Sequence, residues 1–123
     1  MTTSSISVSV PANREALAVL RVVACGAATQ ADIPYDSAED AMLATNEMAS
    51  LMVAADTKAR IEAGFTVAAG EVHVEMSIDP RGSGAWPPAT WEGSLEQRVL
   101  AAVADEVDVS GQGGVLARYR VSG

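Results

Sequence analysis

A polar pair, Asn46-Glu47, interrupts a long apolar helical pattern in the middle of the chain. A carboxylate this close to a buried helical face either extends its charge to solvent or is held there for use, for instance as a base. The sequence by itself leaves both alternatives open. Glu47 is therefore the first candidate for a catalytic residue.

The other side chains that commonly do chemistry favour structural roles. His73 lies on the polar side of a predicted strand, without a Cys, His or paired carboxylate at ligand spacing, and is expected to be exposed. Cys25 has no CxxC or His neighbour in its predicted helix, so we expect a small core residue. Because the sequence also lacks a serine nucleophile elbow and a P-loop, no metal or phosphate site is predicted from motifs.

The segment 79–93, DPRGSGAWPPATWEG, is the longest irregular stretch, and loops of this length are usually functional or mobile. Gly82-Ser83-Gly84 follows a predicted strand, where such a tripeptide is more often a turn than a phosphate cradle. Trp86 and Trp91 leave two alternatives open. They either fold back over the edge of the core or serve as aromatic anchors for a partner or ligand.

The element that positions Glu47 is a helix predicted over Asp36–Asp56. Asp36 or Ser37 is the expected N-cap, and two acidic residues follow in the first turn, where the helix dipole favours negative charge. Its apolar side chains recur at the three- and four-residue spacing of a buried face. That predicted face consists of Ala38, Ala41, Met42, Thr45, Met48, Ala49, Met52 and Val53.

The remaining elements follow from alternation and capping signals. Strands are predicted over residues 4–10, 59–68, 71–78, 107–109 and 115–121, and the second and third form a hairpin. Helices are predicted over 14–29, capped by Asn13, and 95–104, capped by Ser94 with Gln97 in a capping box. In the last helix Leu95, Val99, Ala102 and Val103 are expected to face inward. This order predicts an α+β two-layer sandwich: a mixed or antiparallel sheet of about five strands, with three helices on one face.

Composition narrows the class of protein. The 123 residues suit a single domain spanning 1–123, with a core of small and aliphatic side chains because aromatic residues make up only 4%. A net charge of −8 argues against nucleic-acid binding and fits either a solvated surface or docking onto a basic protein. No apolar run is long enough for a membrane span, no signal peptide is recognised, and the lone cysteine fits a reducing cytoplasm.

Three passages carry a resemblance to a known family: PANREALAVLRVVACGAA, EDAMLATNEMASLMV and SLEQRVLAAVADEVDVSGQGGVLARYRV. In order and spacing, over residues 5–121, the chain resembles anti-sigma factors of the serine-kinase type. These belong to the GHKL (histidine-kinase-like) ATPase superfamily. The resemblance implies a Bergerat-type ATPase fold, a cytoplasmic location and a homodimer.

The resemblance also implies roles for particular residues. In the family an acidic residue polarises the attacking group, and an Asn four positions later holds Mg²⁺; Glu47 matches the first, but Leu51 occupies the second and cannot bind Mg²⁺. Asp79 corresponds loosely to the family's adenine-binding Asp, with Gly82 and Gly84 as its spaced glycines. The family's glycine-rich phosphate lid has no clear counterpart here.

Three functional hypotheses remain. The first is a regulator that sequesters a sigma factor through protein contact, is released by an anti-anti-sigma protein, and has a degraded kinase site. The second is an active serine kinase that uses ATP and Mg²⁺ as cofactors and phosphorylates the anti-anti-sigma partner. In that case Glu47 would be the base and Asp79 would hold adenine. The third is an architectural relative with an unrelated scaffold or small-ligand role.

Overall fold

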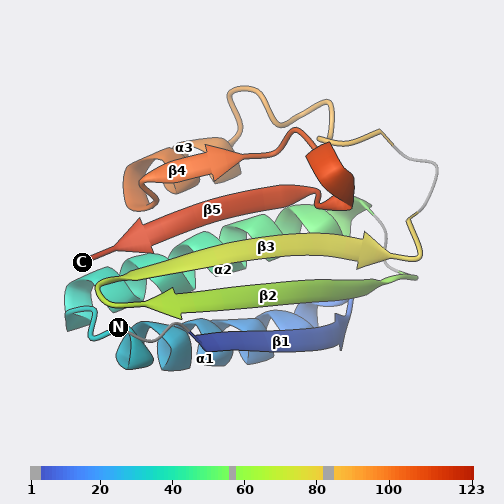
Figure 1. Cartoon of the computed structure of the whole chain (residues 1–123). Coiled ribbons are helices and arrows are strands. Elements are labelled where there is room, and N and C mark those ends of the chain that lie inside the picture. The colour runs from blue at the N-terminus through green and yellow to red at the C-terminus, as the bar shows by residue number, and fades with distance from the viewer. Residues whose placement is uncertain (1–3, 56–57, 82–84) are drawn as a thin grey trace.

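The computed structural model describes residues 4–55, 58–81 and 85–123, which form two layers (Figure 1). One layer is an antiparallel five-stranded sheet with the strand order β1-β2-β3-β5-β4, and the helices cover one of its faces. The expected α+β two-layer sandwich is therefore confirmed. In chain order the elements are β1 (Ser4–Pro11), α1 (Arg14–Gln30), α2 (Tyr35–Ala55), β2 (Arg60–Ala68), β3 (Glu71–Asp79), α3 (Leu95–Val103), β4 (Glu106–Asp108), a 3₁₀ turn (Gln112–Gly114) and β5 (Ala117–Ser122).

The β2–β3 hairpin, which its alternating sequence predicts, lies inside the sheet between β1 and β5. Every second residue is buried against the helices: Ile61, Ala63, Phe65 and Val67 on β2, and Val72, Val74, Met76 and Ile78 on β3. The strands pair from Arg60 opposite Asp79 to Ala68 opposite Glu71. Gly70 makes the turn with a φ of 79°, a conformation that glycine adopts without steric cost.

Helix α1 begins where its capping signal predicts. The Asn13 side chain accepts a hydrogen bond of 3.0 Å from the amide of Ala16. The predicted cap of α2 is wrong, because the helix begins at Tyr35 and places Asp36 and Ser37 inside its first turn. The Pro34 carbonyl accepts from the amide of Ala38 at 2.9 Å, so the helical hydrogen bonding already starts at Pro34. The predicted end at Asp56 lies outside the described residues.

Helix α3 differs from its predicted orientation. Ser94 caps it, accepting from the Gln97 amide at 3.0 Å, but the Gln97 side chain accepts from Gly93 instead of closing the expected box onto Ser94. The fully buried residue is Leu100, which is 1% exposed, and Val103 packs half-buried against the core as predicted. Leu95, in contrast, is 68% exposed and Ala102 is also exposed. In so short a helix the two possible apolar faces are hard to distinguish by spacing, and packing selects the one centred on Leu100.

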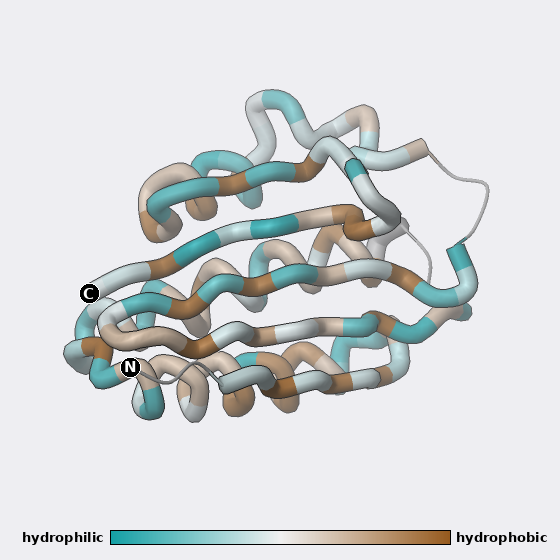
Figure 2. Tube along the Cα trace, viewed as in Figure 1, coloured by the Kyte–Doolittle hydropathy of each residue, from teal (hydrophilic) through white to brown (hydrophobic). Residues whose placement is uncertain are grey.

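The core lies between the sheet and the helices and consists largely of alanine on the helical side. Figure 2 shows the hydrophobic residues alternating along the strands that face α1 and α2. Helix α1 buries Ala16, Leu20, Ala24, Ala27 and Ala28. Helix α2 buries six of its eight predicted residues, with Met42 and Val53 only half-buried, and it also buries Ala44 and Leu51.

One hydrogen bond crosses this core from helix to sheet. The Tyr119 hydroxyl on β5 donates to the Thr45 hydroxyl on α2 at 2.8 Å, and both side chains are almost completely buried. Burial raises the pKa of Tyr119, an effect that the hydrogen bond to Thr45 only partly offsets. The phenol therefore stays neutral and is satisfied by this one contact.

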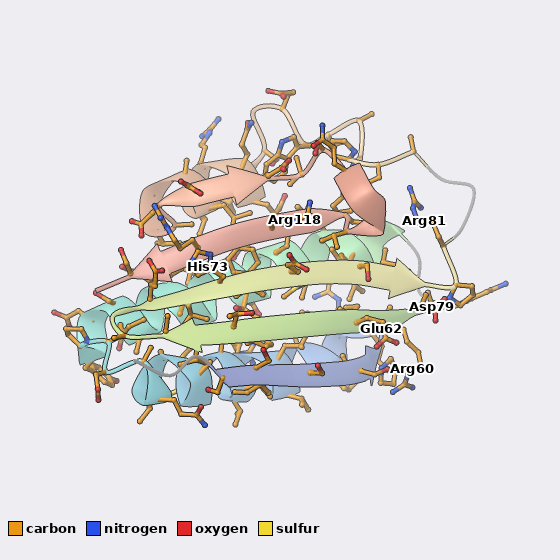
Figure 3. All side chains as sticks on the ribbon, viewed as in Figure 1. Arg60, Glu62, His73, Asp79, Arg81 and Arg118 are labelled. Carbon is orange, nitrogen blue, oxygen red and sulfur yellow. The ribbon has the colours of Figure 1, made fainter. Side chains whose placement is uncertain are left out.

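The opposite face of the sheet is open and polar (Figure 3). His73 is exposed on β3, as predicted, and its Nε2 lies 2.9 Å from Glu71. Arg118 on β5 lies 3.4 Å from Glu75. Both contacts lie at the surface, where ion pairs contribute little to stability. Among the described residues, none of the helices is long and apolar enough to cross a membrane.

The Thr45–Tyr119 bond can be tested by a double-mutant cycle. Thr45→Val leaves the Tyr119 hydroxyl buried without an acceptor and should lower the free energy of unfolding by about 1–3 kcal/mol. Combining it with Tyr119→Phe removes both polar groups, so the double variant should lose less than the sum of the two single variants. Urea denaturation measures all three, and strictly additive losses would contradict a direct bond.

Candidate functional site

The predicted catalytic position lies on α2, on the part of the helix that follows Thr45. Glu47 is half-buried, and the described residues offer it no hydrogen bond or ion pair. Leu51, one turn later, is 5% exposed and belongs to the same core cluster as Trp91 and Leu100. The position that would have to hold a metal ligand is thus occupied by an apolar side chain that packs in the core.

The predicted adenine ligand lies at the end of β3. Asp79 is exposed there, opposite Arg60 in the strand register, and Figure 3 shows it at the margin of the sheet with Arg60, Glu62 and Arg81. The two candidate glycines, Gly82 and Gly84, lie outside the described residues. Of the three residues predicted to contact the nucleotide, the structure therefore describes only Asp79.

The two tryptophans fold back onto the domain. Trp91 is 6% exposed and forms part of the core. Trp86 is half-buried, and its indole N–H donates to the Leu116 carbonyl at 2.9 Å, while the Leu116 amide donates to Met76 on β3. Of the two alternatives open for this loop, the described contacts match the one in which the tryptophans cover the core edge. Trp91 has little surface left for a partner.

Three hollows lined by described residues lie away from these positions. Two of them, of about 380 and 470 Å³, are on the open face of the sheet, around Ser7, Glu62 and Ser77 and around His73, Arg118 and Arg120. A smaller one of about 130 Å³ lies between Arg14 and Val53. None of these is lined by the predicted site residues Glu47, Asp79, Trp86 or Trp91. Within the described part of the chain, moreover, His, Cys, Asp and Glu side chains form no group of three suited to a metal ion.

A different surface feature is present between α1 and α2. A hollow of about 350 Å³ is lined by Arg21, Glu39, Met42, Leu43 and Asn46, here called the α1–α2 groove. The Arg21 guanidinium donates to the Asn46 side chain at 2.6 Å and so fixes the distance between the two helices at this point. The polar residue that the sequence pairs with Glu47 therefore serves a helix–helix contact.

Exposed apolar side chains accompany the groove on the same two helices. Leu43 in the groove is 41% exposed, Val22 on α1 is 70% exposed and Tyr35 at the start of α2 is 76% exposed. The Glu39 carboxylate raises the pKa of the Tyr35 phenol, chiefly by accepting its hydrogen bond. Sequence reasoning assigned no role to these residues, although their exposure follows from the helical phase opposite the buried stripe.

Charge is distributed unevenly over the helical surface. Helix α2 carries the acidic residues Asp36, Glu39, Asp40 and Glu47 and no basic residue. The α1–α2 groove is lined by Met42 and Leu43 together with one carboxylate, Glu39, and one guanidinium, Arg21. The other acidic residues lie on the same helix outside its lining. Such a surface suits a partner that is itself apolar and basic.

The class defined by this fold is an α+β domain with one helix-covered and one open polar sheet face. Comparison with known proteins adds no closer assignment, because no family model matches the chain and no curated protein matches it significantly. The resemblance to anti-sigma factors therefore stays a prediction.

Two substitutions on α2 distinguish a core position from a solvated one. Leu51→Ala removes a buried side chain and should lower the free energy of unfolding by about 2–5 kcal/mol. Glu47→Ala, one turn earlier, removes a half-buried carboxylate without a partner among the described residues and should cost less than about 1 kcal/mol. Thermal or urea unfolding measures both, and similar losses for the two variants would contradict the placement of Leu51 in the core.

Proposed function

We propose that this protein is an anti-sigma-factor-like regulator that acts by protein–protein sequestration, with a degraded kinase site. It would hold a sigma factor in the cytoplasm and release it to an anti-anti-sigma protein. The proposal rests on the sequence resemblance over residues 5–121 and on one structural observation, the α1–α2 groove, which is lined by Met42, Leu43 and Glu39 on an acidic helix.

The open, apolar character of the α1–α2 groove favours a protein partner over a small ligand. The groove lies open between α1 and α2, and Leu43, one of its lining residues, is 41% exposed. An amphipathic helix buries its apolar face in a groove of this kind, and basic residues beside that face would meet the acidic side chains of α2. The net charge of −8 would further accelerate association with a basic partner.

The burial of Leu51 supports the absence of phosphoryl transfer. Mg²⁺ requires oxygen ligands, and a leucine that is 5% exposed supplies none at the position where the resembling family has its Asn. Without a metal to neutralise the phosphates, the electrostatic part of phosphoryl transfer is lost. Glu47 then remains as a half-buried carboxylate without its metal-binding companion.

A test of ATP binding distinguishes the regulator hypothesis from the kinase hypothesis. Titration of ATP with Mg²⁺ into the protein should give no saturable heat by calorimetry, because the metal position is apolar. A defined one-to-one isotherm would contradict this and favour the kinase hypothesis. In that case Glu47→Ala should abolish phosphorylation of an anti-anti-sigma protein while the circular dichroism spectrum stays unchanged.

Partner binding tests the regulator directly. We expect one or more of the host's purified sigma factors to bind the protein in a titration, and Leu43→Glu to weaken that binding at least about tenfold, which corresponds to about 1.4 kcal/mol. The substitution places a charge on the apolar floor of the groove. Ala102→Glu, at an exposed position on α3, is the matched control and should bind as the unmodified protein does.

Failure of every sigma factor to bind would overturn the proposed function and leave the architectural relative as the remaining hypothesis. Binding that Leu43→Glu and Ala102→Glu weaken equally would retain the function but exclude the α1–α2 groove as the docking surface.

A further inference from the structure

The residues that α2 contributes to the α1–α2 groove follow a regular helical spacing. They form one stripe at positions i, i+3, i+4 and i+7, which consists of Glu39, Met42, Leu43 and Asn46. At a rise of 1.5 Å per residue such a stripe is about 10 Å long, or about two helical turns. Arg21 of α1 joins the stripe at its Asn46 end, where the guanidinium donates to the Asn46 side chain. The two ends of the groove therefore differ in charge.

The end of the groove at Glu39 is negative. Glu39 is exposed, and within the described ranges no basic side chain forms an ion pair with it. Its carboxylate accepts a hydrogen bond from the Tyr35 hydroxyl, one turn earlier on the same helix. An ionised carboxylate has about four acceptor positions on its two oxygens, so Glu39 can still pair with an ammonium or guanidinium group.

The other end of the groove carries the positive charge of Arg21. Its guanidinium has five N–H donors, and one of them is directed to Asn46 at 2.6 Å. None of the described carboxylates forms an ion pair with it. The bond to Asn46 holds the guanidinium at the groove, where its remaining donors can bind a carboxylate in the forked geometry that arginine favours.

Between these two ends the lining is apolar. Met42 is half-buried and packs against the core, and Leu43 is 41% exposed. A helix that docks in such a groove presents its own side chains at i, i+3, i+4 and i+7. That spacing is the spacing of the stripe on α2, so a docked helix can match the stripe residue by residue over two turns.

We infer that the α1–α2 groove binds an amphipathic helix that carries one basic and one acidic residue seven positions apart, with two apolar residues at the third and fourth positions between them. The basic residue pairs with Glu39, the acidic residue pairs with Arg21, and the apolar residues cover Met42 and Leu43. The order of the two charges then fixes the direction of the docked helix. This inference rests on the proposed function for the identity of the partner, and it adds which kind of helix in that partner docks.

Arg21 makes the groove more selective than the acidic surface of α2 alone would be. A helix with basic residues at both positions gains the contact with Glu39 but places its second cation beside the guanidinium of Arg21, where like charges repel each other. Specificity of this kind comes from a contact that disfavours the wrong partner. The groove should therefore prefer a helix of mixed charge to a helix that is basic throughout.

A hydrocarbon-stapled helical peptide tests the inference without a natural partner. It presents Lys, Leu, Leu and Glu at positions i, i+3, i+4 and i+7, and fluorescence anisotropy measures its binding to the full chain. We expect saturable one-to-one binding. Replacing the peptide's Lys by Gln should weaken binding about threefold to fivefold, the range of an exposed ion pair. Replacing its Glu by Lys should weaken binding further, because this change adds repulsion from Arg21.

Variants of the protein identify the contacts. Glu39→Gln should weaken binding of the original peptide by the same factor, but it should not further weaken the peptide that lacks Lys, because that ion pair is already lost. Arg21→Gln should behave in the same way toward a peptide whose Glu is replaced by Gln. Asp40→Asn is the matched control, because Asp40 follows Glu39 on α2 but does not line the groove. It should bind as the unmodified protein does.

Three results would overturn the inference: no binding of the stapled peptide, equal binding of the mixed and doubly basic peptides, or a loss in Asp40→Asn as large as that in Glu39→Gln. The last result would indicate attraction by overall charge. Failure of the proposed function is seen separately, in the sigma-factor titration. If the peptide binds with the expected coupling and every sigma factor fails to bind, the groove is a helix-binding site and the proposed function is wrong.

Discussion

The close packing of alanine-rich helices against a sheet of β-branched and aliphatic side chains is the contact on which the rest of the structure depends. Helix α1 buries four alanines and one leucine, and the part of α2 whose burial is described, up to Val53, contributes four more alanines to the same layer. These small side chains leave room in the layer between the helices and the sheet. The larger side chains of Phe65, Met48 and Met52, which are fully buried, fill that room. Polar groups are admitted into this layer only with a partner, as the Thr45–Tyr119 hydrogen bond illustrates.

This packing also decides what α2 can do. Because the helix is pressed against the sheet on one side and contacts α1 and α3 on the others, its side chains have little freedom to form a polar site. Leu51 joins the core, and Asn46 is engaged by Arg21. What remains exposed is the apolar surface around Leu43 and the acidic residues beside it. The helix thus provides a surface for another protein more readily than a pocket for a nucleotide.

The open face of the sheet is polar, whereas the edge at β1 is apolar on the side that faces the helices. Residues on the open face are polar because nothing covers them, and their ion pairs lie at the surface. The edge at β1 is apolar on its helix-facing side, because Ile6 and Val8 continue the core to the margin of the sheet, whereas Ser9 on the open face contacts Arg60 and Glu62.

The sequence by itself determined the element order, the β2–β3 hairpin, the Asn13 cap and the two-layer α+β class, because alternation, helical spacing and capping act over a few neighbouring residues. Only the tertiary structure decided which face of α3 is buried, since nine residues present two plausible apolar faces until Leu100 meets the core. It also decided that Trp91 is buried and that Arg21 binds Asn46 across twenty-five residues. Each of these depends on contacts between segments distant in the sequence, which local patterns do not contain.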